Sequence, residues 1–171
     1  MVITIDPLSE KSFNDASKQV YKYMNRLVDK NKEFVEELIK AGLTVIIDNL
    51  NGAGDSEAPA PDAPQVHIDY SNGDITATLR LRGEDVMFVE FGAGVYYNGA
   101  AGSSPNPLGF DLGYTIGSYG KGQGANEYWH YKNEQGNWRT SRGTEATMPM
   151  YKADTEIRQN FASIAKRVFG S

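Results

Sequence analysis

Hydrophobic residues recur every three or four positions along two stretches of the chain, one near each end. Over residues 12–49 they form one stripe, and the charged residues fall mostly on the opposite side. This spacing is typical of an amphipathic helix. The stripe contains Val20, Met24, Leu27, Phe34, Leu38, Ala41 and Val45, widened on one side by Val28, Val35, Ile39 and Ile46.

A continuous helix over 12–49 has a length of roughly 55 Å at 1.5 Å per residue. That length exceeds the breadth of a compact domain of this size, so one end of the helix is expected to project toward a partner. The alternative is a break near Gly42-Leu43-Thr44, because glycine inside a helix costs free energy. In that case each half packs on its own part of a sheet. The sequence leaves both arrangements open.

Two patterns compete for the start of this helix. Asp6 and Pro7 favour a turn or a helix start, after a short strand over residues 2–5. Ser12 with Asp15 resembles a capping box with Asp in place of the usual Glu, and it places the start at Ser12 instead.

The second helical stretch covers residues 147–169. Thr147 is expected to cap it, and Pro149 suits its first turn. Gly170 is expected to end it. Its apolar face consists of Met150, Ile157, Phe161, Ile164 and Val168.

Between the two helices the hydrophobic period changes to two. Residues 66–70 and 75–82 alternate, and Asn72-Gly73 is a favoured pair for a two-residue hairpin turn. Residues 86–91 are rich in β-branched and aromatic types and predict a third strand, so that 66–91 forms an antiparallel meander. Residues 127–140 predict another hairpin that extends the same sheet.

Two segments lack hydrophobic periodicity. Residues 51–64 contain three prolines and two glycines and read as a surface linker. Residues 92–125 form a glycine-rich loop, and loops of this length are uncommon unless they are functional. The sequence therefore predicts a single α+β domain over 1–171. In it, the long N-terminal helix and the C-terminal helix pack on an antiparallel sheet of about four to six strands.

Composition narrows the functional classes. The chain has no cysteine, which excludes disulfides, thiolate metal sites and a cysteine nucleophile. Its formal net charge of -5 argues against a protein that grips nucleic acid. The first residues lack the pattern of a signal peptide, and no apolar run is long enough for a membrane span. We therefore expect a protein made in the cytoplasm, without a membrane partner.

Motifs for small ligands are weak. The glycine-rich segment around Lys121 lacks the spacing of a P-loop. The two histidines, His67 and His130, have no neighbour at the spacing of metal ligands. We therefore expect no catalytic residue, no bound cofactor and no metal site.

A carboxylate pair for glycoside hydrolysis is the alternative from another class. Glu90 with Glu127 or Asp111 could form such a pair. Aromatic residues near them could bind sugar, which would make the chain a cell-wall or glycan-binding module. Glu90 is more simply interpreted as a solvent-facing residue of the strand 86–91, and the aromatic residues as core or subunit contacts. The aromatic residues are Tyr128, Trp129, Tyr131 and Trp138.

The order of these features, together with several short motifs, resembles the tail-completion proteins of long-tailed phages and prophages, the gene-product-ten-like neck family. The resemblance runs from the first helix to the last. Its best-matching parts are Glu90-Phe-Gly-Ala-Gly94 and residues 143–153, and it includes 128–131 and 136–138. The departures are mild: many relatives have Thr at position 93 and Pro-Phe at 149–150.

The resemblance implies a structural virion protein without enzymatic activity. Such a protein forms a ring, expected to contain six copies, that joins or completes the tail at the head connector. Its partners are other copies of itself, the head-closure or connector protein, and the tail tube or tail terminator. DNA passes through the ring without specific binding. Within the same class, a tail-tube terminator or the collar of a contractile particle is the alternative.

Contact residues for such an assembly are expected in two places. One is an end of the first helix. The other is the glycine-rich loop, whose proposed subunit or tail contacts are Tyr96, Tyr97, Phe110, Tyr114, Tyr119 and Lys121.

Overall fold

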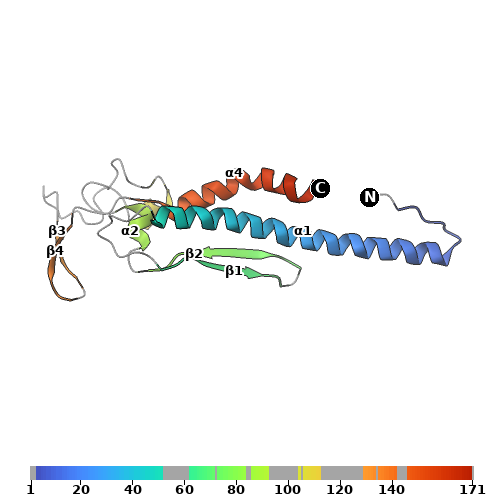
Figure 1. Ribbon diagram of the computed structural model, residues 1–171, viewed down its shortest axis with the longest axis horizontal. Coiled ribbons are helices and arrows are strands. Elements are labelled where there is room, and N and C mark those ends of the chain that lie inside the picture. Colours follow the sequence, from blue (N-terminus) through green and yellow to red (C-terminus); the bar gives the residue numbers. More distant parts are fainter. Residues whose placement is uncertain are drawn as a thin grey trace.

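The computed structural model describes residues 3–51, 62–71, 73–83, 86–92, 104, 106–112, 129–133, 135–141 and 146–170. Its architecture is α+β: a long N-terminal helix and a C-terminal helix pack together with a small two-stranded antiparallel sheet (Figure 1). The elements are α1 (Glu10–Asn51), β1 (Gln65–Asp69), β2 (Thr76–Arg80), α2 (Val86–Phe91), α3 (Leu108–Asp111), β3 (Trp129–Lys132), β4 (Trp138–Ser141) and α4 (Pro149–Phe169).

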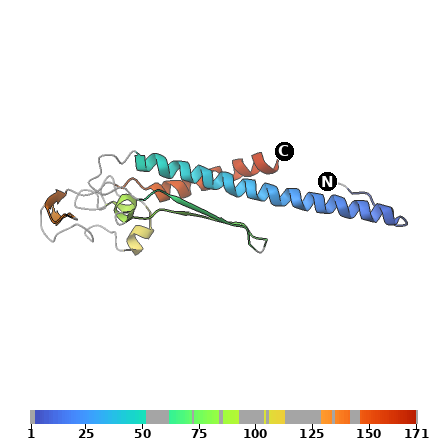
Figure 2. The same ribbon diagram turned by 60° about the horizontal axis from the view of Figure 1, so that its bottom comes forward.

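Helix α1 is continuous over 42 residues, a length of about 63 Å. It begins earlier than the Ser12 capping box predicts, because Ser9 caps it: the Ser12 amide donates to Ser9 Oγ at 3.2 Å. Ser12 Oγ accepts the Asp6 amide at 2.8 Å instead. The strand expected over 2–5 is wrong for residues 3–5, which lie in an irregular arm that doubles back along the start of α1 (Figures 1 and 2).

Gly42 does not break α1, because this glycine lies where three elements meet. It is buried. A Cβ built there would lie 2.7 Å from Ile157 Cδ1 of α4 and 3.0 Å from Leu79 Cδ1 of β2. The absence of a side chain lets α4 and β2 approach α1 closely, which offsets the propensity cost of about 1 kcal/mol for glycine in a helix.

Helix α4 runs antiparallel to the second half of α1 (Figure 1). The Phe34 ring packs edge-on against the Phe161 ring, with centroids 5.1 Å apart, and also contacts Phe169 at 5.6 Å. Nearer the start of α4, Lys152 Nζ donates to Asn49 Oδ1 at 2.7 Å. The most buried side chains of α4 are Pro149, Ala153, Ile164 and Val168.

The hairpin β1–β2 packs beside α1 through β2. Its register pairs Gln65 with Arg80 and Asp69 with Thr76, which centres the turn on positions 72 and 73 as predicted. The Asp74 amide donates to the Ser71 carbonyl at 3.0 Å, and Gly73 has a φ of 82° that favours glycine. This hairpin prediction is confirmed.

The larger predicted sheet is wrong. Among the described residues the strands form two separate two-stranded sheets, β1–β2 and β3–β4. The hairpin β3–β4 turns at 133–136 as expected, but it lies beyond α2 at the far end of the molecule and does not extend the first sheet (Figure 1).

Residues 86–91 form the short helix α2 and not the predicted third strand. Val89, Glu90 and Phe91 are buried in succession, which a half-exposed strand does not allow. Strand propensity is strongly context-dependent. Here hydrogen bonds from the start of α4 to Val89 and Glu90 stabilise the helical arrangement.

Candidate functional site

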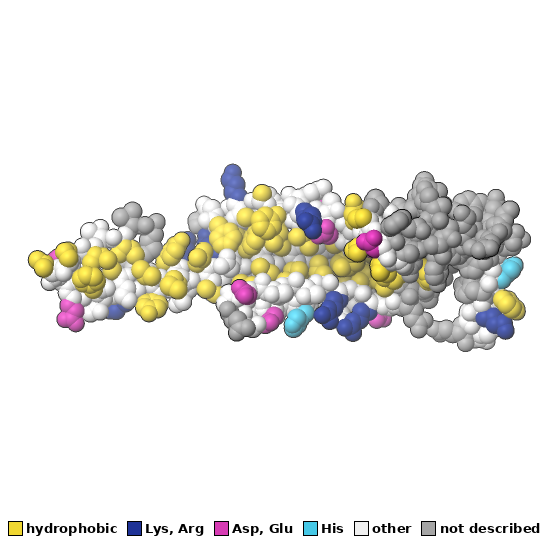
Figure 3. Space-filling model, turned by 180° about the vertical axis from the view of Figure 1, so that it is seen from behind, with side chains coloured by type: hydrophobic (Ala, Val, Ile, Leu, Met, Phe, Trp, Pro, Cys, Tyr) yellow, Lys and Arg dark blue, Asp and Glu magenta, His cyan; other side chains and the backbone are white. Residues whose placement is uncertain are grey.

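The first half of α1 is the most exposed helical part of the described chain. All residues from 17 to 29 are exposed. Figure 3 shows hydrophobic side chains along this projecting half and onward into the body of the molecule. The exposed hydrophobic residues are Phe13, Val20, Tyr21, Tyr23, Met24, Leu27 and Val28.

These residues lie on the face that the second half of α1 buries. Eighteen residues make about five helical turns, so each position lies directly in line with the position eighteen residues later. Val28 is in line with Ile46, and Met24 is in line with Gly42. Val28 is 49% exposed, whereas Ile46 is completely buried. One continuous apolar stripe is therefore covered along the second half of α1 and, apart from the buried Ala16, uncovered along the first half.

Both covering elements end at the same level of α1. On the hairpin side, the Tyr70 hydroxyl donates to Glu36 Oε1 at 3.0 Å, and Lys32 Nζ lies 5.3 Å from the centre of the Tyr70 ring. On the other side, Phe169 at the end of α4 contacts Phe34. We call residues 10–31 of α1 the projecting half and residues 32–51 the covered half.

The projecting half also differs in charge. Residues 10–31 carry five basic and three acidic side chains, a net charge of +2, whereas the whole chain carries -5. The rest of the chain therefore carries -7. Lys18 and Lys22 lie on the side of the helix opposite Val20. The projecting half is thus an amphipathic helix with an apolar face and a basic back.

Glu90 is not the solvent-facing residue that the sequence predicted. Its side chain is only 5% exposed, and its carboxylate accepts the amides of Met150 at 2.8 Å and Tyr151 at 2.9 Å. These are two of the unpaired N–H groups at the start of α4. Glu90 therefore caps α4 from another helix, where the helix dipole also favours a negative charge.

Thr147 does not cap α4. Met148 occupies the cap position with a φ of 57° and makes no side-chain capping bond. The Thr147 amide donates to the Val89 carbonyl at 2.9 Å, and the Met148 amide donates to the same oxygen at 3.2 Å. The predicted start of the helix is correct to within two residues, but the capping group comes from α2.

The carboxylates proposed for a glycosidase pair do not form one in the described part of the chain. Glu90 is engaged in capping. Asp111 is exposed on α3, and Glu127 lies outside the described residues. Of the aromatic group, Trp138 is 68% exposed with Lys132 Nζ 5.2 Å from its ring centre. Tyr128 and the side chains of Trp129 and Tyr131 lie outside the description.

The histidines occupy exposed strand positions. His130 Nδ1 lies 3.0 Å from Thr140 Oγ1 across the β3–β4 pair, and His67 lies on β1. Within the described ranges, no group of three or more His, Asp or Glu side chains is placed to hold a metal ion.

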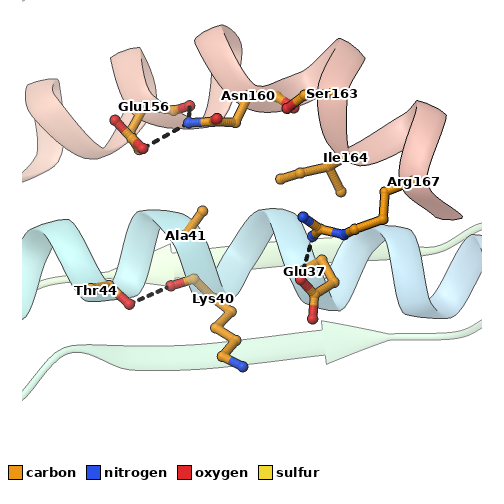
Figure 4. Close-up of a pocket in the computed structure, with 9 residues that line it drawn as sticks. All are labelled: Glu37, Lys40, Ala41, Thr44, Glu156, Asn160, Ser163, Ile164 and Arg167. Carbon is orange, nitrogen blue, oxygen red and sulfur yellow. Dashed lines mark hydrogen bonds and ion pairs between the residues drawn. The ribbon is translucent and has the colours of Figure 1, made fainter.

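A shallow groove of about 300 Å³ lies between α1 and α4 (Figure 4). At one end, Arg167 pairs with Glu37 at 2.6 Å, and across its upper edge the Asn160 amide donates to Glu156 Oε1 at 2.7 Å. Figure 4 shows the Lys40 side chain turned away from the groove. These polar groups bind one another, so the groove is a polar seam between two packed helices.

The loop residues expected to contact neighbours cannot be placed. Tyr96, Tyr97, Tyr114, Tyr119 and Lys121 lie outside the described residues. Phe110 belongs to α3, but its side chain also lies outside the description.

The expected projection of one end of α1, in contrast, is present in the structure.

None of the described helices combines the length and the apolarity that a membrane crossing requires. Comparison with known proteins gives no family: no family model, no curated protein and no solved structure matches the chain.

Proposed function

We propose that this chain is a structural subunit of the phage neck, which forms a ring that joins or completes the tail at the head connector. The observation that carries the proposal is the uncovered apolar face of the projecting half of α1. A helix of this kind works by packing against another protein.

The physical argument is one of stability. An isolated helical segment of about 20 residues is marginal in water, because most helical stability in proteins comes from packing of the apolar face. The projecting half has this face but almost no covering element of its own chain. The exposed apolar face is explained if the chain is a subunit whose packing is completed only in an assembly.

The two best-matching motifs of the resemblance support the proposal because they meet in space. Two hydrogen bonds join them directly, because the Glu90 carboxylate accepts the Met150 and Tyr151 amides. Two more come from the residue before the first motif, since the Val89 carbonyl accepts the Thr147 and Met148 amides. Two stretches that lie about 60 positions apart thus form a single structural unit.

The experiment is to delete the gene from the phage or prophage that carries it and to examine the particles by electron microscopy. We expect separate heads and tails, and restoration of joined particles by the full-length chain supplied in trans. An antibody to the chain should label the junction of head and tail. Normal particles from the deletion strain, or label only at the distal tail tip, would refute the proposal.

The same micrographs separate the alternatives within the structural class. A tail terminator leaves tails of irregular length when it is missing, whereas a joining protein leaves tails of normal length that do not bind heads. A variant lacking residues 99–122 should remain folded but fail to restore joined particles. If it restores them, the glycine-rich loop is not a contact.

A further inference from the structure

The apolar face of the projecting half is too wide for one neighbour. At 100° per residue, its side chains span an arc of about 160°, from Tyr23 through Leu27, Val20 and Met24 to Tyr21. The seam of a two-helix coiled coil is narrower, since it uses only two positions in seven.

The covered half shows what such an arc requires. There the same arc is shared by two elements, α4 on one side and β2 on the other. Phe34 contacts α4, whereas Gly42 lies between Ile157 of α4 and Leu79 of β2. Because the projecting half carries the equivalent arc five turns earlier, it also has room for two elements side by side.

We propose that the projecting halves of three or more copies of this chain pack around a common axis, so that each contacts two neighbours. The Tyr23 flank, which consists of Tyr23 and Leu27, packs on the Met24 flank, Met24 and Val28, of the next copy. The contact is head-to-tail in type, which closes into a ring and not into a two-fold dimer. It specifies the subunit contact of the proposed function, on which it rests.

The shape of the molecule favours a second copy over a lipid surface. Helix α4 and the hairpin both stand beside the covered half, where they share the apolar face of α1, and both end before the projecting half (Figures 1 and 2). Each adds a layer about 10 Å thick. Because these layers stand out beside the covered half and are missing beside the projecting half, they would hold a flat membrane away from part of the uncovered face. Helices of neighbouring copies can fill the space that the missing layers leave.

The area suits a closed ring better than an isolated pair. The seven exposed hydrophobic side chains offer on the order of 500 Å² per copy, from about 150–250 Å² for each fully buried aromatic and half-exposure of most of them. Each copy divides this face between two neighbours, so one contact brings together about 500 Å², and the two contacts of one copy in a ring bring together about 1,000 Å², near the lower limit of specific interfaces. The basic side chains Lys18 and Lys22 lie outside the packed arc, so we expect salt to strengthen association by screening their repulsion.

The test uses the purified full-length chain and two double variants. Tyr23→Gln with Leu27→Gln removes one flank, and Met24→Gln with Val28→Gln removes the other. We expect the wild-type chain to have the mass of three or more copies by sedimentation equilibrium. Each double variant should be monomeric, with the circular dichroism spectrum of the wild-type chain diluted to its monomeric state, since all four positions are exposed.

The mixture of the two double variants is the decisive sample. Each variant keeps one intact flank, so one native contact can form between them. The mixture should therefore show one-to-one dimerisation that is weaker than wild-type association and rises with concentration, with no larger species. The matched control is Lys22→Gln with Asn25→Gln, which changes two exposed residues on the other side of the helix and should keep the wild-type mass.

Three results would overturn this inference. They are a wild-type chain that stays monomeric or dimeric at 100 μM and 0.15 M salt, flank variants with wild-type mass, and a mixture that stays monomeric. Binding of the wild-type chain to phosphatidylserine vesicles without self-association would equally refute it. If the chain labels the head–tail junction but shows any of these results, the inference fails and the proposed function stands.

Discussion

The two halves of α1 carry the same apolar stripe but end in different environments. In the covered half, Ile46 is completely buried, and α4 and β2 share the face. In the projecting half, Val28 occupies the equivalent position and is half exposed. An amphipathic pattern therefore predicts that one face of a helix will be covered. It does not indicate whether the covering element belongs to the same chain.

The largest expected effect comes from truncating this matched pair. Ile46→Ala should lower the free energy of unfolding by about 2–5 kcal/mol, because it leaves a cavity in a closed core. Val28→Ala should change it by less than about 0.5 kcal/mol in the monomer, because the side chain is exposed. Urea unfolding in the Tyr23→Gln, Leu27→Gln background, which removes association, measures both. Equal losses at the two positions would contradict the comparison.

A second pair adds volume instead of removing it. Gly42→Val places atoms where Ile157 and Leu79 already lie, and should destabilise by about 1–3 kcal/mol. Met24→Val, at the equivalent position of the projecting half, should be almost neutral for the monomer. The measurement is again the urea midpoint. A Gly42→Val variant as stable as wild type would show that α4 and β2 can move apart at no cost.

The third prediction concerns the anchor that places α4 on the covered half. Glu90→Gln keeps the shape of the side chain but leaves a single acceptor oxygen for two part-buried amides, and should cost about 1–2 kcal/mol. Asp48→Asn, an exposed carboxylate on α1, is the control and should be neutral. Hydrogen exchange of the Met150 and Tyr151 amides should accelerate in the first variant alone. Unchanged exchange would refute capping by Glu90.

The smallest effect lies at the boundary of the two halves. The hydrogen bond to Glu36 raises the pKa of Tyr70 above its ordinary value of 10.0, with added contributions from burial and the negative charge. Because the folded-state pKa is the higher one, the contact stabilises the fold below pH 10 and is lost as the pH rises through the folded-state pKa. Carbon-13 NMR titration of the tyrosine rings should show that the pKa of Tyr70 is lower in Glu36→Gln than in the wild type. In the control variant Glu33→Gln the pKa of Tyr70 should not change. Identical titration curves for Tyr70 in the two variants would contradict the hydrogen bond between Tyr70 and Glu36.

The local predictions that succeeded depended on near neighbours in the chain. The helical stripe, the Asn72-Gly73 turn and the start of α4 to within two residues each follow from residues within a few positions. The strand predicted over 86–91 failed because its residues suit a strand in isolation. Their helical conformation is stabilised by amides that lie about 60 positions later.

The candidate site divides in the same way. The sequence left open both a continuous α1 with one projecting end and a helix broken near Gly42, and the structure shows the continuous helix. The sequence placed Glu90 on a solvent-exposed strand, and no local pattern identifies a carboxylate that caps a helix so distant in sequence. No local pattern identifies Gly42 as a point of close contact, because that contact depends on the positions of Ile157 and Leu79.

Residue order therefore determined where α1 and α4 form and which of their faces are apolar, because these depend on interactions over one or two helical turns. The tertiary structure decided which half of α1 is covered, why glycine stands at position 42 and what Glu90 binds. Each of these depends on the distance between segments far apart in the chain, and that distance is set by the packing of the whole molecule.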